Sequence, residues 1–340
     1  MLKVKDLKVR KGSFLLEIPE FEMETHEMVS ILGPSGSGKT TFLEAIMGFV
    51  KLESGRIYLY GNDITDLPPW ERNIAIVYQS PYLFPHLTVK ENLLFGSKAC
   101  EMFVNNLAER LNISDLLQRY PHQLSAGQRQ RISLIRAIAT RPLLLLMDEP
   151  FNFLDPNNKE DLRHLIKEIR EFFLLPIVLV THDLEEAFYY SDRIGVLEKG
   201  KLIALSKPFE LIKAPPDDFV ATFLGKANFI PVERKEGKYF ANGTEIFLPR
   251  EVDKDNFVVM LRPQDVILSE TEPPHSSARN HFKAKVLEVI GGSKVNEVRL
   301  ESGNIKISAY VTDASKEELR LVPGKEVFVI FKATALHIFD

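Results

Sequence analysis

Short apolar runs and stretches of helical periodicity alternate along the first two thirds of the chain. The apolar runs are typical of buried strands and lie at residues 28–32, 54–62, 74–77, 143–147 and 177–180. Apolar residues at helical spacing and helix-start signals predict helices at about residues 41–47, 88–96, 101–119, 126–139 and 155–172. This alternation of strands and helices indicates an α/β domain.

The pattern changes after about residue 226, where alternation with period two replaces helical spacing. Phe282, Ala284 and Val286 alternate with lysines, and residues 305–311 show the same alternation. Turn signals at Gly291-Gly292 separate these stretches. We therefore expect a small all-β, barrel-like domain at residues 229–340 that follows an α/β domain at residues 1–228.

The second domain contains a candidate internal repeat. In residues 257–268 an apolar strand ends at Arg262 and is followed by a short crossing and another apolar pair. Residues 328–338 show the same pattern around Lys332. The match is one of pattern more than identity, so chance similarity of two β-strands is the alternative.

Length, charge and cysteine content exclude several classes of protein. The 340 residues are long for one domain and natural for two, and a net charge of -4 disfavours a general nucleic-acid binder. The start of the chain has no signal-peptide character, and Pro176 interrupts the longest apolar run, so we expect an intracellular chain that does not itself cross a membrane. Cys100 is the only cysteine, so we expect no internal disulfide or cysteine metal site, and a packing or surface thiol.

Residues Gly33 to Thr40 match the phosphate-loop pattern G-x-x-x-x-G-K-[ST], between a predicted strand and a predicted helix. Glycines let the backbone approach phosphates, and N–H groups at the helix start face their negative charge. Lys39 reaches the terminal phosphates, and Thr40 offers a hydroxyl to Mg²⁺. The alternative, a glycine-rich turn without a ligand, does not account for the strand predicted before the motif and the helix predicted after it. The candidate nucleotide-binding residues are Gly33, Ser35, Gly36, Ser37, Gly38, Lys39, Thr40 and Thr41.

Polar residues follow three other predicted strands at their carboxyl ends, where ligands bind in open α/β sheets. They are Gln79, Asp148, Glu149 and His182. Ser125 is a candidate N-cap, so the helix after it begins with free N–H groups aimed outward. For each of these residues taken alone, a surface or structural role is the alternative.

The segment from Pro81 to Leu87 is apolar, aromatic and broken by proline, which favours an ordered surface loop. Thr88 and Glu91 then have the spacing of a capping box that opens a helix. An exposed apolar loop of this kind usually has a protein partner.

The chain resembles the ATP-binding cassette (ABC) ATPases over about residues 2–225. The resemblance rests on the order of the phosphate loop, Gln79, Leu124 to Gln128, Asp148-Glu149 and His182. A generic P-loop kinase or GTPase lacks the signature stretch, which in this family is usually Leu-Ser-Gly-Gly-Gln. Here Ala126 replaces the first glycine, which is tolerated unless that position needs positive φ. The family also implies a helical subdomain, at about residues 88–140.

The resemblance implies a homodimer in which each ATP lies between the phosphate loop of one subunit and the signature helix of the other. It implies that Thr40, Gln79 and Asp148 hold the Mg²⁺ shell. Lys39, Gln79, Glu149 and His182 then form the catalytic set, in which Glu149 orients or deprotonates the attacking water and His182 contacts the γ-phosphate. The residues implied to act across the dimer are Ser125, Ala126, Gly127, Gln128 and Asp155.

Two stretches depart from the family pattern. Before Asp155 stand Asn152, Phe153 and Leu154, where the family commonly has small Ser-Ala, so dimer contacts are expected to be bulkier. Where relatives place an aromatic that stacks on adenine, this chain has Arg-Lys-Gly at residues 10–12. Phe14 is a candidate substitute for that aromatic, with a core position as the alternative.

The C-terminal domain resembles the regulatory domain of molybdate and tungstate importer ATPases. Ser277-Ala278-Arg279-Asn280 and Phe331-Lys332-Ala333-Thr334 are similar to the oxyanion-binding elements of small molybdate-binding domains. A hydroxyl with cations suits a tetrahedral dianion, so the regulatory candidates are Ser277, Arg279 and Lys332. A solvated loop arginine and an edge-strand lysine are the alternative.

The resemblance thus implies an importer ATPase, peripheral to the cytoplasmic face of the membrane, that works with two permease subunits and an extracytoplasmic solute-binding protein. The candidate permease contacts are Tyr82, Phe84, His86 and Leu87. A different solute, such as sulfate, iron, sugar or polyamine, is one alternative. A non-transport ABC ATPase is the other, although such proteins tend to carry coiled-coil insertions or paired cassettes.

Overall fold

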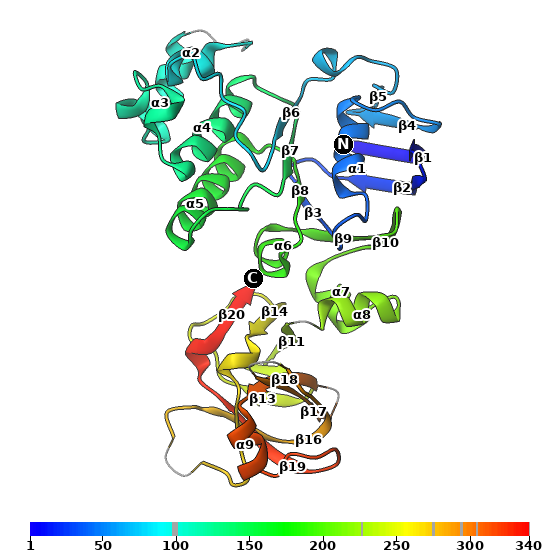
Figure 1. Ribbon diagram of the computed structural model, residues 1–340, viewed down its shortest axis with the longest axis vertical. Helices are drawn as coiled ribbons and strands as arrows, with labels where there is room; N and C mark the ends of the chain where they lie inside the picture. Colours follow the sequence, from blue (N-terminus) through cyan, green and yellow to red (C-terminus); the bar gives the residue numbers. More distant parts are fainter. Residues whose placement is uncertain (97–100, 226, 274–275, 293–294, 304, 340) are drawn as a thin grey trace. The chain divides into compact units, whose positions relative to one another are not determined.

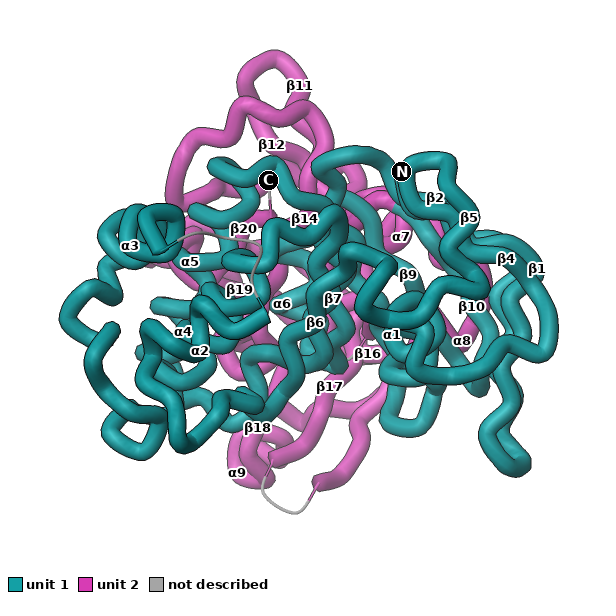
Figure 2. Tube along the Cα trace, turned by 90° about the horizontal axis from the view of Figure 1, so that it is seen from above, with its two compact units in different colours: residues 1–206 teal, residues 207–340 magenta. Residues whose placement is uncertain are grey.

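The computed structural model describes residues 1–96, 101–225, 227–273, 276–292, 295–303 and 305–339. The chain forms two compact units, Met1–Ser206 and Lys207–Asp340, drawn in teal and magenta in Figure 2. Among the described residues, no helix combines the length and apolar character needed to span a bilayer. The prediction for Cys100 falls outside the described residues.

The first unit is built on one mixed sheet of ten strands, in the order β5-β4-β1-β2-β10-β9-β3-β8-β7-β6 (Figure 1). The pairs β3–β9, β3–β8, β7–β8 and β6–β7 are parallel, so their carboxyl ends share one edge. The strands are β1 (Leu2–Lys11), β2 (Phe14–Met23), β3 (Met28–Leu32), β4 (Ser54–Leu59), β5 (Asn62–Asp63), β6 (Ile74–Val77), β7 (Leu144–Asp148), β8 (Ile177–Val180), β9 (Arg193–Glu198) and β10 (Lys201–Ser206). The predicted buried strands at 28–32, 74–77 and 177–180 are confirmed.

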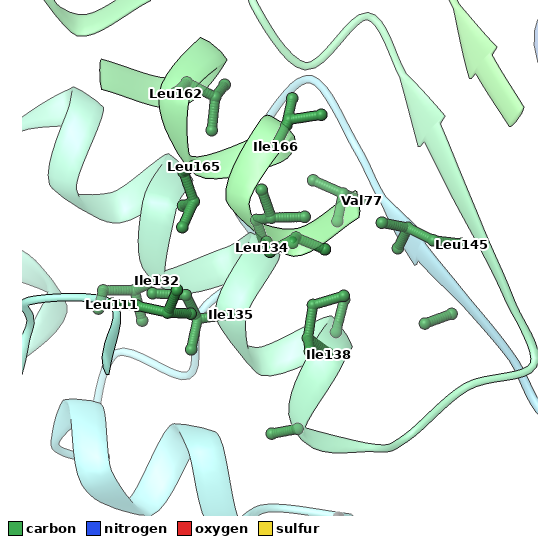
Figure 3. Close-up of a cluster of buried hydrophobic side chains, with 14 of the residues drawn as sticks. Val77, Leu111, Ile132, Leu134, Ile135, Ile138, Leu145, Leu162, Leu165 and Ile166 are labelled. Carbon is green, nitrogen blue, oxygen red and sulfur yellow. The ribbon is translucent and has the colours of Figure 1, made fainter. Parts of the chain in front are cut away.

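Helices cover both faces of the parallel strands, and the apolar residues of β7 and β8 are buried on both faces. In β7, Leu144 and Leu146 pack in the cluster that contains α1, whereas Leu145 and Met147 pack in the cluster that contains α4 and α5. Figure 3 shows the second cluster, between α4, α5 and the strands. The helices are α1 (Lys39–Met47), α2 (Val89–Leu94), α3 (Glu101–Arg110), α4 (Ala126–Ala139), α5 (Pro156–Phe173) and α6 (Leu184–Tyr190), with short 3-10 turns at Pro69–Glu71, Ser114–Leu116 and Pro121–Gln123.

The prediction of one helix over residues 101–119 is wrong, because α3 ends at Arg110. Asn112 adopts a left-handed conformation, with φ 52°. The N–H of Ile113 then bonds the carbonyl of Ala108 at 2.9 Å, which closes the helix end. Asparagine tolerates this conformation, so Asn112 ends the helix inside a stretch whose helical apolar spacing continues beyond it.

The second unit consists of two five-stranded antiparallel sheets around one core, preceded by α7 (Pro208–Lys213) and α8 (Asp218–Leu224). The predicted period-two alternation is present: Ala284 and Val286 are buried, and Lys283 and Lys285 beside them are exposed. Helix α7 packs on β11 and β14. The elements are β11 (Asn228–Lys235), β12 (Lys238–Ala241), β13 (Thr244–Ile246), β14 (Asn256–Leu261), β15 (Ile267–Ser269), β16 (Asn280–Ile290), β17 (Asn296–Ser302), β18 (Ile305–Val311), α9 (Asp313–Glu318), β19 (Glu326–Phe331) and β20 (Leu336–Phe339).

The predicted internal repeat is present in the topology. Strands β11 to β15 form one copy of the repeat, and strands β16 to β20 form the other. The sheet orders, β13-β12-β11-β14-β20 and β18-β17-β16-β19-β15, place corresponding strands of the two copies in the same positions. After Arg262 and after Lys332, a 3-10 turn carries the chain across to the other sheet. Each copy therefore gives its last strand to the other copy's sheet.

The first residue of each copy is a buried asparagine that makes the same pair of bonds. Asn228 binds both backbone groups of Ser308, at 2.8 and 2.7 Å. Asn280 binds both backbone groups of Phe247, at 2.9 and 2.8 Å. Each copy is therefore tied to the backbone of the other.

Candidate active site

The phosphate loop has the backbone that its glycines allow. Gly36 and Gly38 lie at φ 79° and 107°, and Gly38 caps α1. A β-carbon on Gly33 would overlap the carbonyl oxygen of Leu197. The N–H of Gly200 also donates to the carbonyl of Ser37, at 2.9 Å. The hairpin of β9 and β10 thus contacts the backbone of the phosphate loop at both Gly33 and Ser37.

Lys39 is buried beneath this loop, with its ammonium group bonded to the carbonyls of Gly33 at 2.8 Å and Pro34 at 3.1 Å. Burial lowers its pKa, an effect that the charges of Glu149 and Asp148 oppose. The hydroxyl of Ser37 is buried and has no partner among the described residues. An incompletely neutralised cation and an orphaned hydroxyl fit a bound anion such as a phosphate.

Asp148 ends β7 at the carboxyl edge of the sheet, close to Thr40 at the start of α1. Burial raises the pKa of Asp148, and a hydrogen bond from the Thr40 side chain opposes that change. A carboxylate and a hydroxyl are the oxygen ligands that Mg²⁺ prefers. Thr40 and Asp148, two of the three residues predicted to hold the metal, therefore lie together.

Glu149 follows in a left-handed conformation, with φ 48°. Its Oε2 atom lies 3.3 Å from Nδ1 of His182, which is 56% exposed at the end of β8. The side-chain amide of Asn152 donates to the same oxygen. The carboxylate and the imidazole therefore stand side by side at the carboxyl edge of the sheet, and Asn152 contacts the same carboxylate.

Gln79 lies half-buried after β6, on the strand next to β7. Its neighbour Tyr78 accepts a bond from the Gln130 side chain, at 3.1 Å between Nε2 and the carbonyl oxygen. Gln130 is buried and belongs to α4. The signature helix is thus tied directly to the segment that carries Gln79.

The loop of residues 81–87 has no helix or strand, as predicted, and its shape is set by two side chains. The Nδ2 atom of Asn92 donates to the carbonyls of Phe84 and Leu87, both at 3.1 Å, and its Oδ1 accepts from the N–H of Phe84 at 2.8 Å. Arg136 donates to the carbonyl of Tyr82 at 2.7 Å. Tyr82 remains 67% exposed, and His86 is exposed too. The loop is therefore braced by hydrogen bonds, with Tyr82 and His86 exposed and the ring of Phe84 packed on Phe95.

The signature helix begins with the predicted cap. The Ser125 hydroxyl accepts from the N–H of Gln128 at 3.1 Å, and the Gln128 side chain accepts from the N–H of Ser125 at 3.0 Å. Ala126 is exposed and adopts an ordinary helical φ, so the replacement of glycine causes no strain there. Asp155 caps α5 by accepting from the N–H of Asn158 at 3.0 Å. The capping prediction for Ser125 is confirmed, and α5 begins where a helix was predicted.

Phe14 begins β2 and packs as a partly buried residue on the core beneath α1. A β-carbon on Gly38 would stand 2.8 Å from its ring, so the ring covers the end of the phosphate loop. That position suits a core role and also an approach to a nucleotide bound above the loop.

The regulatory candidates lie at one end of the second unit. Asn280 pairs with Phe331, so the residues just before and after them, Arg279 and Lys332, lie on neighbouring strand ends. Both are exposed, as is Ser277. The guanidinium of Arg279 lies 3.9 Å from the ring centre of Phe247, where it is held by a cation–π contact.

Sequence reasoning missed four residues that shape the site: Asn92, Gln130, Arg136 and Asn152. Asn92 had a usable signal, because it is a polar residue beside Leu93 at a buried helical position. Gln130 and Arg136 contact segments that only the tertiary fold brings near, whereas Asn152 contacts Glu149 within one short turn.

Comparison with known proteins gives two family matches. The ABC transporter family model matches residues 16–152, and the TOBE domain model matches residues 276–338. The molybdate/tungstate import ATP-binding protein WtpC of Pyrococcus abyssi is 38% identical over 346 residues, covering 100% of both chains. The sulfate/thiosulfate import ATP-binding protein of Synechococcus elongatus is 35% identical over 338 residues, covering 96% of this chain and 94% of the relative.

Solved structures resemble the first part of the chain. A nucleotide-free ATP-binding cassette from an ABC transporter is 27% identical, with a TM-score of 0.59, and covers 66% of this chain and 98% of its own. A dimeric cassette in a post-hydrolysis state with ADP and phosphate is 29% identical, with a TM-score of 0.51, and covers 61% and 98%. The predicted fold class, an ABC-type α/β domain followed by an all-β domain, is confirmed.

Proposed function

The chain belongs to the ABC transporter family, and we propose that it is the ATP-hydrolysing subunit of an importer. The main support for this proposal is that the residues suited to bind phosphate and the residues suited to activate water lie at the same edge of the sheet. Lys39 and the phosphate loop lie at the start of α1, Thr40 bonds Asp148, and Glu149 contacts His182. Phosphoryl transfer to water needs mainly positioning and charge compensation, and these residues supply both.

In this proposal Glu149 accepts a proton from the attacking water, and His182 donates a hydrogen bond to the γ-phosphate. Lys39 neutralises the phosphates that replace its present backbone partners. Thr40, Asp148 and Gln79 would hold Mg²⁺, which supplies additional positive charge to the phosphate oxygens. Phe14 is the candidate for contact with adenine.

A second copy of the chain completes the site. Helix α1 and helix α4 cover opposite faces of strands β6 to β8, as Figures 1 and 2 both show. One chain therefore cannot bring its own signature helix over its own phosphate loop. The dimer would place Ser125 to Gln128 and Asp155 of one copy against the nucleotide of the other, and a solved relative is a dimer with ADP and phosphate.

The loop of residues 81–87 is the proposed contact with a permease subunit, through Tyr82, Phe84, His86 and Leu87. It follows Gln79 directly, and Asn92 and Arg136 hold it to α2 and to the signature helix α4. Two permease subunits and, indirectly, an extracytoplasmic solute-binding protein would complete the importer. The chain would then lie at the cytoplasmic face of the membrane without entering it, with residues 1–228 as the ATPase domain and residues 229–340 as the regulatory domain.

Molybdate or tungstate is the proposed solute class. Relatives named as molybdate/tungstate import proteins from Pyrococcus abyssi, Pyrococcus horikoshii and Thermococcus kodakarensis are 38–40% identical. Sulfate, iron and putrescine import proteins are 34–36% identical over nearly as much of the chain. Another of these solutes is therefore the alternative.

An oxyanion bound near Ser277, Arg279 and Lys332 would act as a regulator. The neighbouring strand ends put two cations together, which is the charge that a tetrahedral dianion requires. Titration calorimetry with tungstate tests this part. We expect heat with the wild-type chain and a loss of that heat in Arg279→Ala; equal heat in both contradicts the assignment.

The importer role itself is tested by co-purification and transport. The chain should hydrolyse ATP in the presence of Mg²⁺ and should co-purify with an integral-membrane protein of its own cell. Replacing Tyr82 by Ala should weaken that association and leave hydrolysis by the isolated chain unchanged. A chain that hydrolyses ATP but co-purifies with no integral-membrane protein of its own cell would contradict the importer role.

A further inference from the structure

An apolar pocket of about 250 Å³ lies between α3 and the last turns of α4 and α5. Pro142 and Leu175 stand just before β7 and β8, so the pocket borders the amino ends of strands whose carboxyl ends carry the proposed ATP site. Ile138, labelled in Figure 3, comes from the last turn of α4. The pocket is therefore separate from the ATP site. Its lining residues are Phe103, Ile138, Arg141, Pro142, Phe173 and Leu175.

Several of the lining residues have an exposed apolar neighbour in the sequence. These neighbours are Met102, Leu143, Phe172 and Leu174, which are 70%, 43%, 51% and 54% exposed. The rings of Phe172 and Phe173 pack edge to face, with 4.8 Å between their centres. Apolar surface left exposed beside an apolar pocket is typical of a protein contact site.

Two arginines lie flat on aromatic rings at this pocket. The guanidinium carbon of Arg141 lies 4.2 Å from the ring centre of Phe103, and that of Arg110 lies 3.4 Å from the ring centre of Phe172. Phe103 and Arg110 are seven residues apart on α3, so they lie on one side of the helix and about 10 Å apart along it. Within the described part of the chain, neither arginine forms an ion pair with a carboxylate. A guanidinium stacked by its face keeps the N–H groups at its edge for an acceptor.

The backbone fixes the position of Arg141. The residue is left-handed, with φ 52°, and its N–H donates to the carbonyl of Ile138 at 2.9 Å. Two residues later the N–H of Leu143 donates to the carbonyl of Asn73 at 2.8 Å. The turn between α4 and β7 is thus tied at both ends, and the pocket is formed before any partner arrives.

The size and charge of the pocket select its occupant. A volume of 250 Å³ is below the range of about 300–1,000 Å³ that is usual for small-molecule sites, but it accommodates one large apolar side chain. Protein interfaces commonly place such an anchor in a pocket and surround it with polar contacts. Two arginines without carboxylate partners complement acidic residues, to which a guanidinium can bind through two parallel bonds. An anionic membrane surface is instead recognised by a larger cluster of lysines and arginines.

We propose that this pocket binds an acidic segment of a partner protein, with one aromatic or leucine side chain in the pocket and carboxylates on Arg110 and Arg141. The inference goes beyond the proposed ATPase function and does not depend on it, because the pocket shares no residue with the ATP site. A segment bound here would nevertheless contact the signature helix, since Ile138 lies on α4.

Selection of random dodecapeptides displayed on phage is the first test. The full chain is the bait, and phage that also bind the double variant Arg110→Glu, Arg141→Glu are removed. We expect the enriched peptides to share one aromatic residue or leucine flanked by aspartate or glutamate. Selection that enriches no peptide, or only peptides without acidic residues, overturns the proposal.

Fluorescence anisotropy with one enriched peptide, made synthetically, measures the contribution of the two arginines. We expect the peptide Kd to rise at least tenfold in the double variant Arg110→Gln, Arg141→Gln, and to rise similarly when the acidic residues of the peptide become amides. Both arginines are exposed, so the variant should fold, which thermal unfolding checks. The matched control is Arg119→Gln, another exposed arginine, which should change Kd less than twofold. Equal binding by the wild type and the double variant overturns the proposal.

Sedimentation with phosphatidylglycerol vesicles tests the membrane alternative. We expect no vesicle binding that depends on Arg110 and Arg141. Binding that the double variant loses would assign the two arginines to an anionic membrane surface and overturn the proposal. A chain that binds the peptide but does not hydrolyse ATP would contradict the proposed function alone.

Discussion

Asn158 fills the space beside Gly127, so that a β-carbon on the glycine would overlap its side-chain amide. This contact joins the first turns of α4 and α5. The N–H of the same asparagine donates to Asp155, the cap of α5. Two helix starts that are predicted to meet the second copy are thus packed as one piece.

Gly127→Ala should therefore disrupt both helix starts. The added methyl group must displace Asn158 and weaken the Asp155 cap, so we expect a loss of about 1–3 kcal/mol in the free energy of unfolding and a clear loss of ATP hydrolysis. Ala126→Gly, one residue earlier and free of such contacts, should cost no more than about 1 kcal/mol. Urea denaturation of both variants checks the contrast, and equal stability in the two would contradict it.

Asn92→Ala should loosen the loop of residues 81–87. The side chain is fully buried and bonds backbone groups of Phe84, Leu87 and Thr88, which would lose their partner. We expect the free energy of unfolding to fall by about 2–4 kcal/mol. Thermal unfolding measures the loss, and proteolysis should cut the loop first; a variant as stable as the wild type would show that the brace is dispensable.

Asp148→Asn should stabilise the chain in the absence of nucleotide. Burial raises the folded-state pKa of Asp148 above its ordinary 3.8, so the charged form is disfavoured in the folded chain. The resulting cost is absent below the unfolded-state pKa and complete above the folded-state pKa. At pH 7 the variant should be more stable by up to about 1 kcal/mol, and the difference should vanish as the pH falls below 4.

The same variant should lose stabilisation by ATP with Mg²⁺, because it removes a negative metal ligand. Denaturation curves at pH 7 and pH 4, with and without the nucleotide, separate the two effects. A variant less stable than the wild type at pH 7 without ligand would contradict the burial argument.

Asn228→Ala and Asn280→Ala should destabilise the second unit by similar amounts. Each asparagine makes one pair of backbone bonds to the other copy of the repeat. Loss of either should cost about 2–3 kcal/mol, measured by urea denaturation. A large effect in only one variant would show that the two copies are not equivalent in stability.

Much of the site could be predicted because its signals are local in sequence. The phosphate loop, the Ser125 cap and the acids after β7 each depend on a strand end or helix start that neighbouring residues specify. The same is true of the strands at 28–32 and 177–180, whose continuous apolar runs are typical of strands buried on both faces.

What could not be predicted depends on contacts between distant segments. Gln130 reaches Tyr78, and Arg136 reaches Tyr82, across more than fifty residues of chain. The sequence pattern indicated a short crossing after Arg262 and after Lys332, but it had no signal for which sheet the strands β15 and β20 would join. The early end of α3 was missed because Asn112 interrupts an apolar pattern that continues beyond it.

We infer that Glu149 and His182 take part in ATP hydrolysis at a site shared by two copies of the chain. Sedimentation and phosphate release of Glu149→Gln with ATP and Mg²⁺ test it most directly. We expect turnover to fall at least 100-fold and the chain to sediment as a dimer with ATP and as a monomer without it. Hydrolysis at the wild-type rate, or a monomer in saturating ATP, would contradict the account.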